Sequence, residues 1–193
     1  AGVASFVRQG YQGTTVEEIA ERCGLTKGSV YFYFKSKEGL LSALLERAET
    51  VVVDAMVKRV SDQSGGGVDK LVAFIHGQAR LGVTNPDLVL LLILMSLEFA
   101  GKDHPIERRT KAIYERLYRT LEHIIELGKT RGEFRSDIRT LEQAAIVMAG
   151  HDGTFLEWYR RRAAFDGEEL VRALRTSMLA GLMAPQAHEE GTR

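Results

Sequence analysis

Residues 14–37 read TTVEEIAERCGLTKGSVYFYFKSK. Thr15, Thr26 and Ser36 each predict a helix start, because a hydroxyl at that position can accept a hydrogen bond from a free N–H of the first turn. Gly24 predicts a helix end, because glycine takes up the left-handed conformation that closes a helix. The segment therefore predicts two short helices joined by a tight turn, with a third helix directly after them. This is the layout of a helix-turn-helix.

The first of these helices has one apolar face and one charged face. Val16, Ile19, Ala20 and Cys23 recur at helical spacing. Glu18 stands three residues after Thr15, the spacing of a capping box. After the glycine, the next residue, leucine, is expected to turn inward. A connection this short forces two helices to cross steeply.

The second helix, Lys27 to about Phe34, is unusual for a purely structural helix. Val30 and Phe34 lie four residues apart and can anchor it to a core. The positions left outside are Lys27, Gly28, Ser29, Tyr31, Phe32 and Tyr33. A lysine, small polar residues and hydroxylated aromatics suit contacts with phosphates, base edges and thymine methyl groups. The alternative is an ordinary helical hairpin whose aromatic residues lie in a core.

Residues 10–45 resemble the DNA-binding domain of the tetracycline-repressor (TetR) family along a continuous, ungapped stretch. The resemblance implies that Thr15, Tyr31 and Lys37 contact phosphates, while the groove residues are Lys27, Gly28, Ser29, Phe32 and Tyr33. Thr26, which caps the groove helix, is counted with them. Position 33 is often histidine in the family, and the tyrosine here is expected to alter base preference rather than fold. For Lys37 the alternative is an ordinary solvated lysine.

Composition neither supports nor excludes a nucleic-acid partner. Lys plus Arg and Asp plus Glu both number 26, which gives a formal net charge of zero. A DNA contact therefore depends on where the lysines lie rather than on bulk charge. Cys23 is the single cysteine, which rules out an intrachain disulfide and a cysteine-based metal site, and it is expected to pack in a core. The most apolar run, residues 88–97, is too short to cross a membrane, so we expect a cytoplasmic protein.

The rest of the chain predicts more helices and no strands, so the fold class is all-α. One long helix is expected over residues 36–60, followed by helices over 68–84, from Pro86 onward, over 105–131, from Thr140 (capped together with Gln143) to 164, and from Asp166 to 183. We expect a helix-turn-helix domain over 1–47 with a truncated first helix, a larger effector-binding and dimerisation domain over 48–184, and a polar tail over 185–193.

A small-residue stripe marks a candidate dimer interface. Ala145, Ala149 and Gly153 recur every fourth residue, and small side chains let a neighbouring helix approach closely. Together with Leu170, Leu174 and Met178 of the last helix, they predict a four-helix interface between two subunits. The alternative is that this stripe packs within one subunit.

No catalytic or metal-binding pattern is present, so we expect no enzyme, no metal and no cofactor. His151 beside Asp152 is a weak acid–base candidate. The family resemblance implies instead a small, mostly apolar effector bound among the C-terminal helices. Its candidate contacts are His76, Arg80, Met95, Glu98, Phe99, Tyr114, Tyr118, His151, Asp152, Phe155, Trp158 and Tyr159. For any one of the aromatic residues the alternative is plain core packing.

The sequence thus predicts a homodimeric transcriptional repressor that binds a palindromic operator in double-stranded DNA and is released by a small molecule. A second hypothesis is a helical sensor or adaptor protein that does not bind specific DNA. Activation instead of repression remains open at this point.

Overall fold

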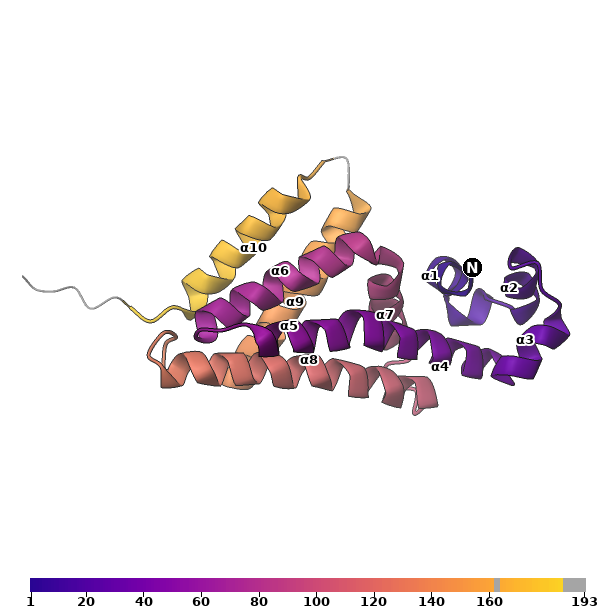
Figure 1. The fold of residues 1–193 in the computed structure, drawn as a ribbon, viewed down its shortest axis with the longest axis horizontal. Helices are drawn as coiled ribbons and strands as arrows, with labels where there is room; N and C mark the ends of the chain where they lie inside the picture. Colours follow the sequence, from indigo (N-terminus) through magenta and orange to yellow (C-terminus); the bar gives the residue numbers. More distant parts are fainter. Residues whose placement is uncertain (162–163, 186–193) are drawn as a thin grey trace, which may run out of the picture. The chain divides into compact units, whose positions relative to one another are not determined.

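The computed structural model describes residues 1–161 and 164–185. Over these residues the chain is helical, apart from connecting turns and one isolated antiparallel bridge between Phe134 and Met183. The all-α prediction is confirmed (Figure 1). The elements are α1 (Gly2–Gly13), α2 (Val16–Arg22), α3 (Lys27–Phe34), α4 (Lys37–Ala48), the π-helical segment η1 (Glu49–Asp54), α5 (Ala55–Asp62), α6 (Gly67–Thr84), α7 (Pro86–Glu98), α8 (Pro105–Thr130), α9 (Thr140–Arg160) and α10 (Gly167–Leu182).

Spatial contacts divide the chain into two compact units. Unit 1 comprises Ala1–Lys58 and Arg80–Leu117, and unit 2 comprises Arg59–Ala79 and the chain from Tyr118 onward. The functional boundaries at residues 47 and 184 stay predictions. Residues 186–193 of the predicted tail lie outside the described residues.

The helix-turn-helix forms because its local signals agree. Thr15 and Thr26 cap α2 and α3: their hydroxyl oxygens accept hydrogen bonds from the N–H groups of Glu18 at 3.2 Å and Ser29 at 3.1 Å. Gly24 has a φ of +65°, which closes α2 in the left-handed conformation. The predicted caps and turn are confirmed, and α3 packs against both α2 and α4.

Two details of this turn differ from expectation. The N–H of Leu25 donates to the carbonyl of Ala20 at 2.9 Å and the N–H of Gly24 to that of Glu21 at 3.0 Å, which is the Schellman pattern. This tight closure directs the Leu25 side chain outward, where it is 53% exposed. Cys23, expected in the core, is exposed because it is the C-cap of α2 rather than part of its buried face.

The helix predicted over 36–60 forms, but with a π-helical segment at its centre. Ser36 caps its start, and α4, η1 and α5 follow one another without a break. Buried residues recur at Leu45, Ala48, Val52 and Met56. In a regular α-helix, each four-residue step, from Ala48 to Val52 and from Val52 to Met56, would turn the next buried side chain by about 40° away from the buried face. The wider π turn returns them to one face.

Glu49 of η1 is tied to α8 by ion pairs inside unit 1. Its carboxylate accepts hydrogen bonds from Arg109 and Arg116, both at 2.6 Å, and Arg116 also donates to Asp54 at 2.6 Å. The hydrogen bonds that Arg116 donates to Glu49 and Asp54 raise its pKa. These contacts hold the π-helical segment in place.

Helix α7 begins with Pro86 as predicted, and its aliphatic side chains are mostly buried. It packs on α1 and α4. Leu97, at its end, is 68% exposed, so burial is restricted to the central turns of the helix. Gly132, with a φ of +71°, follows the end of α8.

In unit 2, α9 packs on α10, and Gly150 permits the approach. A Cβ added at Gly150 would lie 2.9 Å from the Met178 Cε and 3.3 Å from a Leu174 methyl group. Asp166 caps α10 as predicted. Thr140 does not cap α9: Arg139 holds that position, and the Thr140 hydroxyl instead donates to Glu126.

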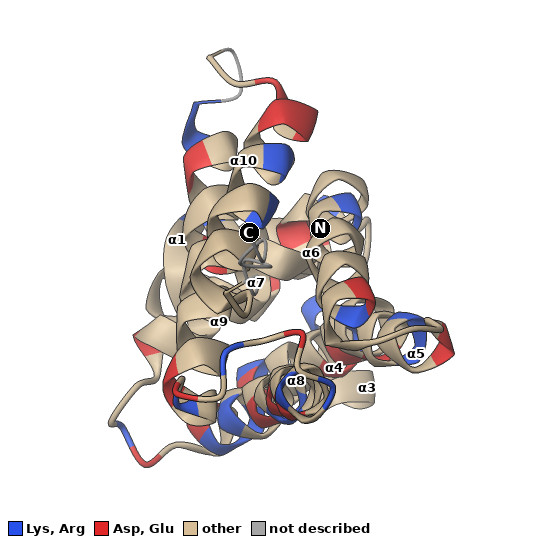
Figure 2. Ribbon diagram, turned by 90° about the vertical axis from the view of Figure 1, so that its left-hand side faces the viewer, with Lys and Arg blue, Asp and Glu red and all other residues tan. Residues whose placement is uncertain are grey.

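Charges are interspersed rather than gathered by sign, as Figure 2 shows along α8. This agrees with the formal net charge of zero.

Candidate functional site

Helix α3 presents its aromatic residues to solvent. Phe32 is 70% and Tyr33 75% exposed, and Tyr31 is 37% exposed, whereas Val30 is only 4% exposed. Val30 therefore anchors the helix, and the rings of Phe32 and Tyr33, with centroids 5.3 Å apart, project from it. The alternative that these aromatic residues lie in a core is wrong.

The first turn of α3 adds a cation and small polar groups to the same exposed surface. Gly28 leaves the backbone open, since a Cβ there would meet only the Thr26 hydroxyl, at 3.8 Å. The Ser29 and Thr26 hydroxyls lie 2.9 Å apart. Lys27 lies 5.6 Å from the centroid of the Tyr31 ring. Together these groups offer hydrogen-bond donors, a positive charge and flat apolar faces.

Lys27 forms an ion pair with Glu17 of α2. The hydrogen bond between them raises the pKa of Lys27 and lowers that of the Glu17 carboxyl. Both side chains are more than half exposed, so the pair is weak and solvent-screened. Lys27 can therefore exchange Glu17 for another partner at little cost.

Lys37, in the first turn of α4, is half-buried and already bonded within the protein. Its ammonium donates to the main-chain carbonyls of Tyr11 at 2.8 Å and Thr14 at 3.0 Å, and lies 4.3 Å from the Tyr11 ring centroid. A phosphate contact by Lys37 stays a prediction, and it would require exchange of these partners. Lys35 is exposed, and its ammonium donates to the carbonyl of Phe32 at 2.7 Å.

The residues predicted to contact an effector fall into both units. Arg80, Met95, Glu98 and Phe99 belong to unit 1. Within that unit the Glu98 carboxylate accepts the Tyr11 N–H, and the Phe99 ring lies 5.1 Å from the ring of Tyr11. These two side chains thus support the end of α1, a role that the sequence analysis missed.

Unit 2 brings together an aromatic and polar group on α9. The Phe155 ring lies 6.1 Å from the rings of both Trp158 and Tyr159. One turn earlier, His151 is buried, and its Nδ1 lies 3.0 Å from the Asp152 carboxylate. Burial is the main cause that raises the pKa of Tyr118, and the negative charge of Asp152 raises it further.

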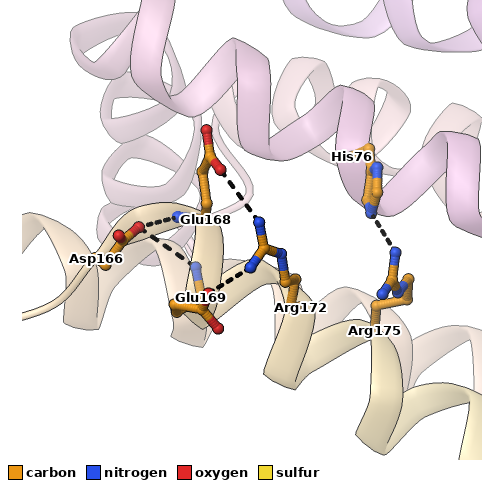
Figure 3. A network of polar contacts seen from close by, with 6 residues as sticks. All are labelled: His76, Asp166, Glu168, Glu169, Arg172 and Arg175. Carbon is orange, nitrogen blue, oxygen red and sulfur yellow. Dashed lines mark hydrogen bonds and ion pairs between the residues drawn. The ribbon is translucent and has the colours of Figure 1, made fainter.

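His76 contacts α10 instead of this group. Figure 3 shows the Arg175 guanidinium directed at its Nε2, at 3.4 Å. A guanidinium can only donate, so the His76 Nε2 accepts this bond. Burial, followed by the charges of Arg175 and Arg59, lowers the pKa of His76. Nearer the start of α10, Arg172 pairs with Glu168 and Glu169 in the same view.

The candidate dimer residues on α9 are exposed. Ala145, Ala149 and Gly153 face solvent, and a Cβ at Gly153 would meet nothing within 4 Å. Leu141 and Ile146 on the same helix are 65% and 50% exposed. The α10 candidates differ, because Leu174 and Met178 already contact α9 at Gly150.

Within residues 1–161 and 164–185, no group of three or more His, Cys, Asp or Glu side chains is arranged to hold a metal ion. No single helix among the described residues is long and apolar enough to cross a membrane. Helices α6 and α7 taken together meet that criterion by length and composition, but they are broken at Asn85.

Comparison with known proteins identifies the family. The profile described as "Bacterial regulatory proteins, tetR family" matches residues 1–44. The chain is 47% identical to the MbdR regulator of Azoarcus sp. CIB, whose crystal structure superposes with a TM-score of 0.84 over 94% of this chain and 95% of that one. The protein belongs to the TetR family of bacterial transcriptional regulators.

Two curated relatives extend beyond the helix-turn-helix. The HTH-type transcriptional regulator AcrR of Shigella flexneri is 27% identical over 174 residues, which cover 86% of this chain and 79% of the relative. The HTH-type transcriptional repressor BepR of Brucella suis is 24% identical over 187 residues, covering 94% and 90%. The likeness thus includes the C-terminal helices.

Proposed function

We propose that the protein is a cytoplasmic transcriptional repressor that inserts α3 into the major groove of an operator. The carrying observation is the contrast within α3 between the buried Val30 and the exposed Phe32 and Tyr33. The large aromatic side chains at the tip of the helix-turn-helix expose apolar surface to water. This exposure is unfavourable, and a binding partner would cover the surface. The word "repressor" in the name of the relative BepR supports repression over activation.

In this proposal, two subunits bind as a two-fold dimer. Symmetric operators are read by two α3 helices about 34 Å apart, one helical turn of DNA. The surface proposed to meet the second subunit consists of exposed apolar and small side chains of α9, namely Leu141, Ala145, Ala149 and Gly153. Leu170, Leu174 and Met178 of α10 complete it. Close approach of helices at small residues favours such an interface.

The DNA contacts proposed for each subunit combine positioning with base reading. Thr15, Tyr31 and Lys37 would contact phosphates. The groove set would be Thr26, Lys27, Gly28, Ser29, Phe32 and Tyr33. The exposure of Lys27, Phe32 and Tyr33 supports this assignment. Lys37 is its weakest member, because its ammonium is already satisfied by two carbonyls.

A small, mostly apolar molecule would release the operator by binding among the C-terminal helices. The aromatic group of Phe155, Trp158 and Tyr159, beside the buried His151, supports unit 2 as its location. Release requires that the molecule bind one arrangement of the subunits more tightly than the other.

The test begins with selection of binding sequences from a pool of random DNA duplexes by the full-length protein. The selected site and a scrambled duplex of the same composition are then compared by fluorescence anisotropy at two salt concentrations. We expect a palindromic site, affinity at least about 10³-fold above the scrambled control, and a steep fall with salt. A sensor or adaptor without specific DNA binding would yield no enriched sequence and no such salt dependence.

A further inference from the structure

The five residues Gly10–Thr14, here called the strap, join the body of α1 to the start of the helix-turn-helix. The helical path of α1 breaks at Gly10, where φ is +70° and ψ is −180°. After a break of this kind the next N–H groups have no carbonyl partner in the preceding turn. The N–H groups of Tyr11 and Gln12 must therefore find acceptors elsewhere.

Glu98, the last residue of α7, supplies those acceptors. Its two carboxylate oxygens accept the Tyr11 N–H at 2.9 and 3.1 Å, and one of them accepts the Gln12 N–H at 3.4 Å. A carboxylate here satisfies the free donors and the positive end of the new helical turn at once. Glycine suits position 10 because a φ of +70° is strained for other residues, and a Cβ there would also lie only 3.2 Å from the Glu98 carboxylate.

Lys37 holds the same strap from the opposite side. The main chain of Tyr11 is hydrogen-bonded on both sides. Its N–H donates to the Glu98 carboxylate, and its carbonyl accepts from the Lys37 ammonium. The Lys37 ammonium also donates to the carbonyl of Thr14. The Thr14 hydroxyl in turn donates to the Gly10 carbonyl at 2.7 Å. Thr14 directly precedes the α2 cap and Lys37 directly follows the α4 cap, so one ammonium joins the two ends of the helix-turn-helix.

Aromatic packing places the strap against the end of α7. The Tyr11 ring lies 5.1 Å from Phe99 and 6.1 Å from Phe6, and it is nearly parallel to Phe6. His104 lies 4.6 Å from Phe99, and its Nε2 lies 3.4 Å from the Glu38 carboxylate of α4. All of these groups belong to unit 1.

We propose that Glu98 is a positioning residue for operator binding, which holds the strap so that Lys37 can join the two ends of the helix-turn-helix. The proposal rests on the proposed function and extends it to a residue that touches no DNA. Without the Glu98 carboxylate, we expect the strap and the start of α2 to lose their fixed conformation in part of the molecules, and those molecules do not fit the groove. Apparent affinity then falls in proportion to the fraction of protein that remains competent.

The experiment compares Glu98→Gln with Asp87→Asn on the selected operator. Glutamine keeps the length of Glu98 but offers a single acceptor oxygen and no charge. Asp87 is exposed in the first turn of the same helix, so its change removes the same charge without touching the strap. Removing a negative charge should by itself strengthen DNA binding slightly. We expect Asp87→Asn to bind as well as the wild type or slightly better, and Glu98→Gln to bind about tenfold more weakly.

Two further readouts separate positioning from a general loss of fold. The slope of log affinity against log salt should stay unchanged in Glu98→Gln, because the phosphate contacts are the same. Hydrogen exchange of the Tyr11 and Gln12 amides should accelerate at least about tenfold, while the amides of α9 keep their wild-type rates.

Equal or tighter operator binding by Glu98→Gln, or unchanged exchange at Tyr11 and Gln12, would overturn the proposal while leaving the repressor function intact. Failure of the wild-type protein to select any operator would instead contradict the proposed function. The exchange measurement on Tyr11 and Gln12 would then still decide whether Glu98 holds the strap.

Discussion

Helices α3 and α7 are both rich in apolar residues, yet they meet opposite environments within unit 1. In α7 the central side chains from Leu88 to Ile93 are at most 7% exposed. In α3 only Val30 is buried, and Phe32 and Tyr33 are among the most exposed large side chains of the described chain. Apolar content therefore does not by itself decide burial.

The difference lies in the type and placement of the side chains. Helix α7 carries branched aliphatic residues on all faces of its central turns and packs on α1 and α4, so water is excluded from it. Helix α3 combines aromatic rings with Lys27, Gly28 and Ser29, and packs on α2 and α4. Its aromatic face is not packed into the core of unit 1 and stays exposed, which supports its proposed role as a binding surface.

The largest expected effect tests the buried half of this contrast. Leu91→Ala in α7 removes a side chain that is 0% exposed, and we expect it to lower the free energy of unfolding by about 2–5 kcal/mol. The matched change Phe32→Ala in α3 should shift it by less than about 0.5 kcal/mol. Urea denaturation followed by circular dichroism measures both. Equal losses in the two variants would contradict the contrast.

The second prediction tests the exposed half. Tyr33→Ala should weaken operator binding by about fivefold to a hundredfold while leaving the unfolding transition unchanged, because the ring lies outside the core and is proposed to contact DNA. Tyr33→Phe keeps the ring and should lose only the part due to the hydroxyl. Anisotropy titrations on the selected operator measure both changes. If Tyr33→Ala bound the operator with wild-type affinity, the proposed placement of α3 in the groove would be wrong.

A smaller effect is expected for the cation on α3. Lys27→Met should reduce the slope of log affinity against log salt by up to about one per subunit, because a cation that lies in the groove close to the DNA charge is lost. Lys102→Met removes the same charge from an exposed position outside the helix-turn-helix and should leave the slope unchanged. Titrations at four or more salt concentrations give the slopes. Identical slopes for the two variants would mean that Lys27 does not lie close to the DNA.

The smallest effect concerns pH. The hydrogen bond from Lys27 lowers the pKa of Glu17 below its ordinary 4.5 in the folded state. The stabilisation from this pair is therefore fully present above the unfolded pKa and is lost as the pH falls through the folded one. Glu17→Gln should flatten the fall in melting temperature between about pH 5 and pH 3 slightly.

Glu21→Gln, an exposed carboxylate on the same helix, serves as the control for the pH experiment. An equally steep acid transition in wild type and Glu17→Gln would show that the pair contributes nothing.

Most features governed by near neighbours were predicted correctly, although the predicted cap at Thr140 was wrong. The caps at Thr15, Thr26, Ser36 and Asp166 and the glycine turn at Gly24 each depend on groups within a few residues. Local geometry alone can satisfy these hydrogen bonds, so the residue type and its spacing suffice. The two misplaced side chains, Cys23 and Leu25, lie at a helix end, where helical periodicity no longer tells which way a residue points.

Contacts between distant segments could not be predicted in this way. Glu98 was assigned to an effector, but it lies 87 residues from the Tyr11 amide that it holds. A weak signal was present: Gly10 interrupts a helical pattern, and an interruption leaves amide groups that need an acceptor. Nothing in the chain pattern says which of the carboxylates supplies it.

By itself the sequence determined the all-α class, the helix-turn-helix and the exposed aromatic face of α3, because these follow from caps, turns and periodicity over fewer than ten residues. Only the tertiary structure decided that Lys37 joins the two ends of the helix-turn-helix and that Glu98 holds the strap. Those bonds exist because folding brings a kinked α1, the start of α4 and the end of α7 to one place. The free N–H and carbonyl groups there must be paired once water is excluded.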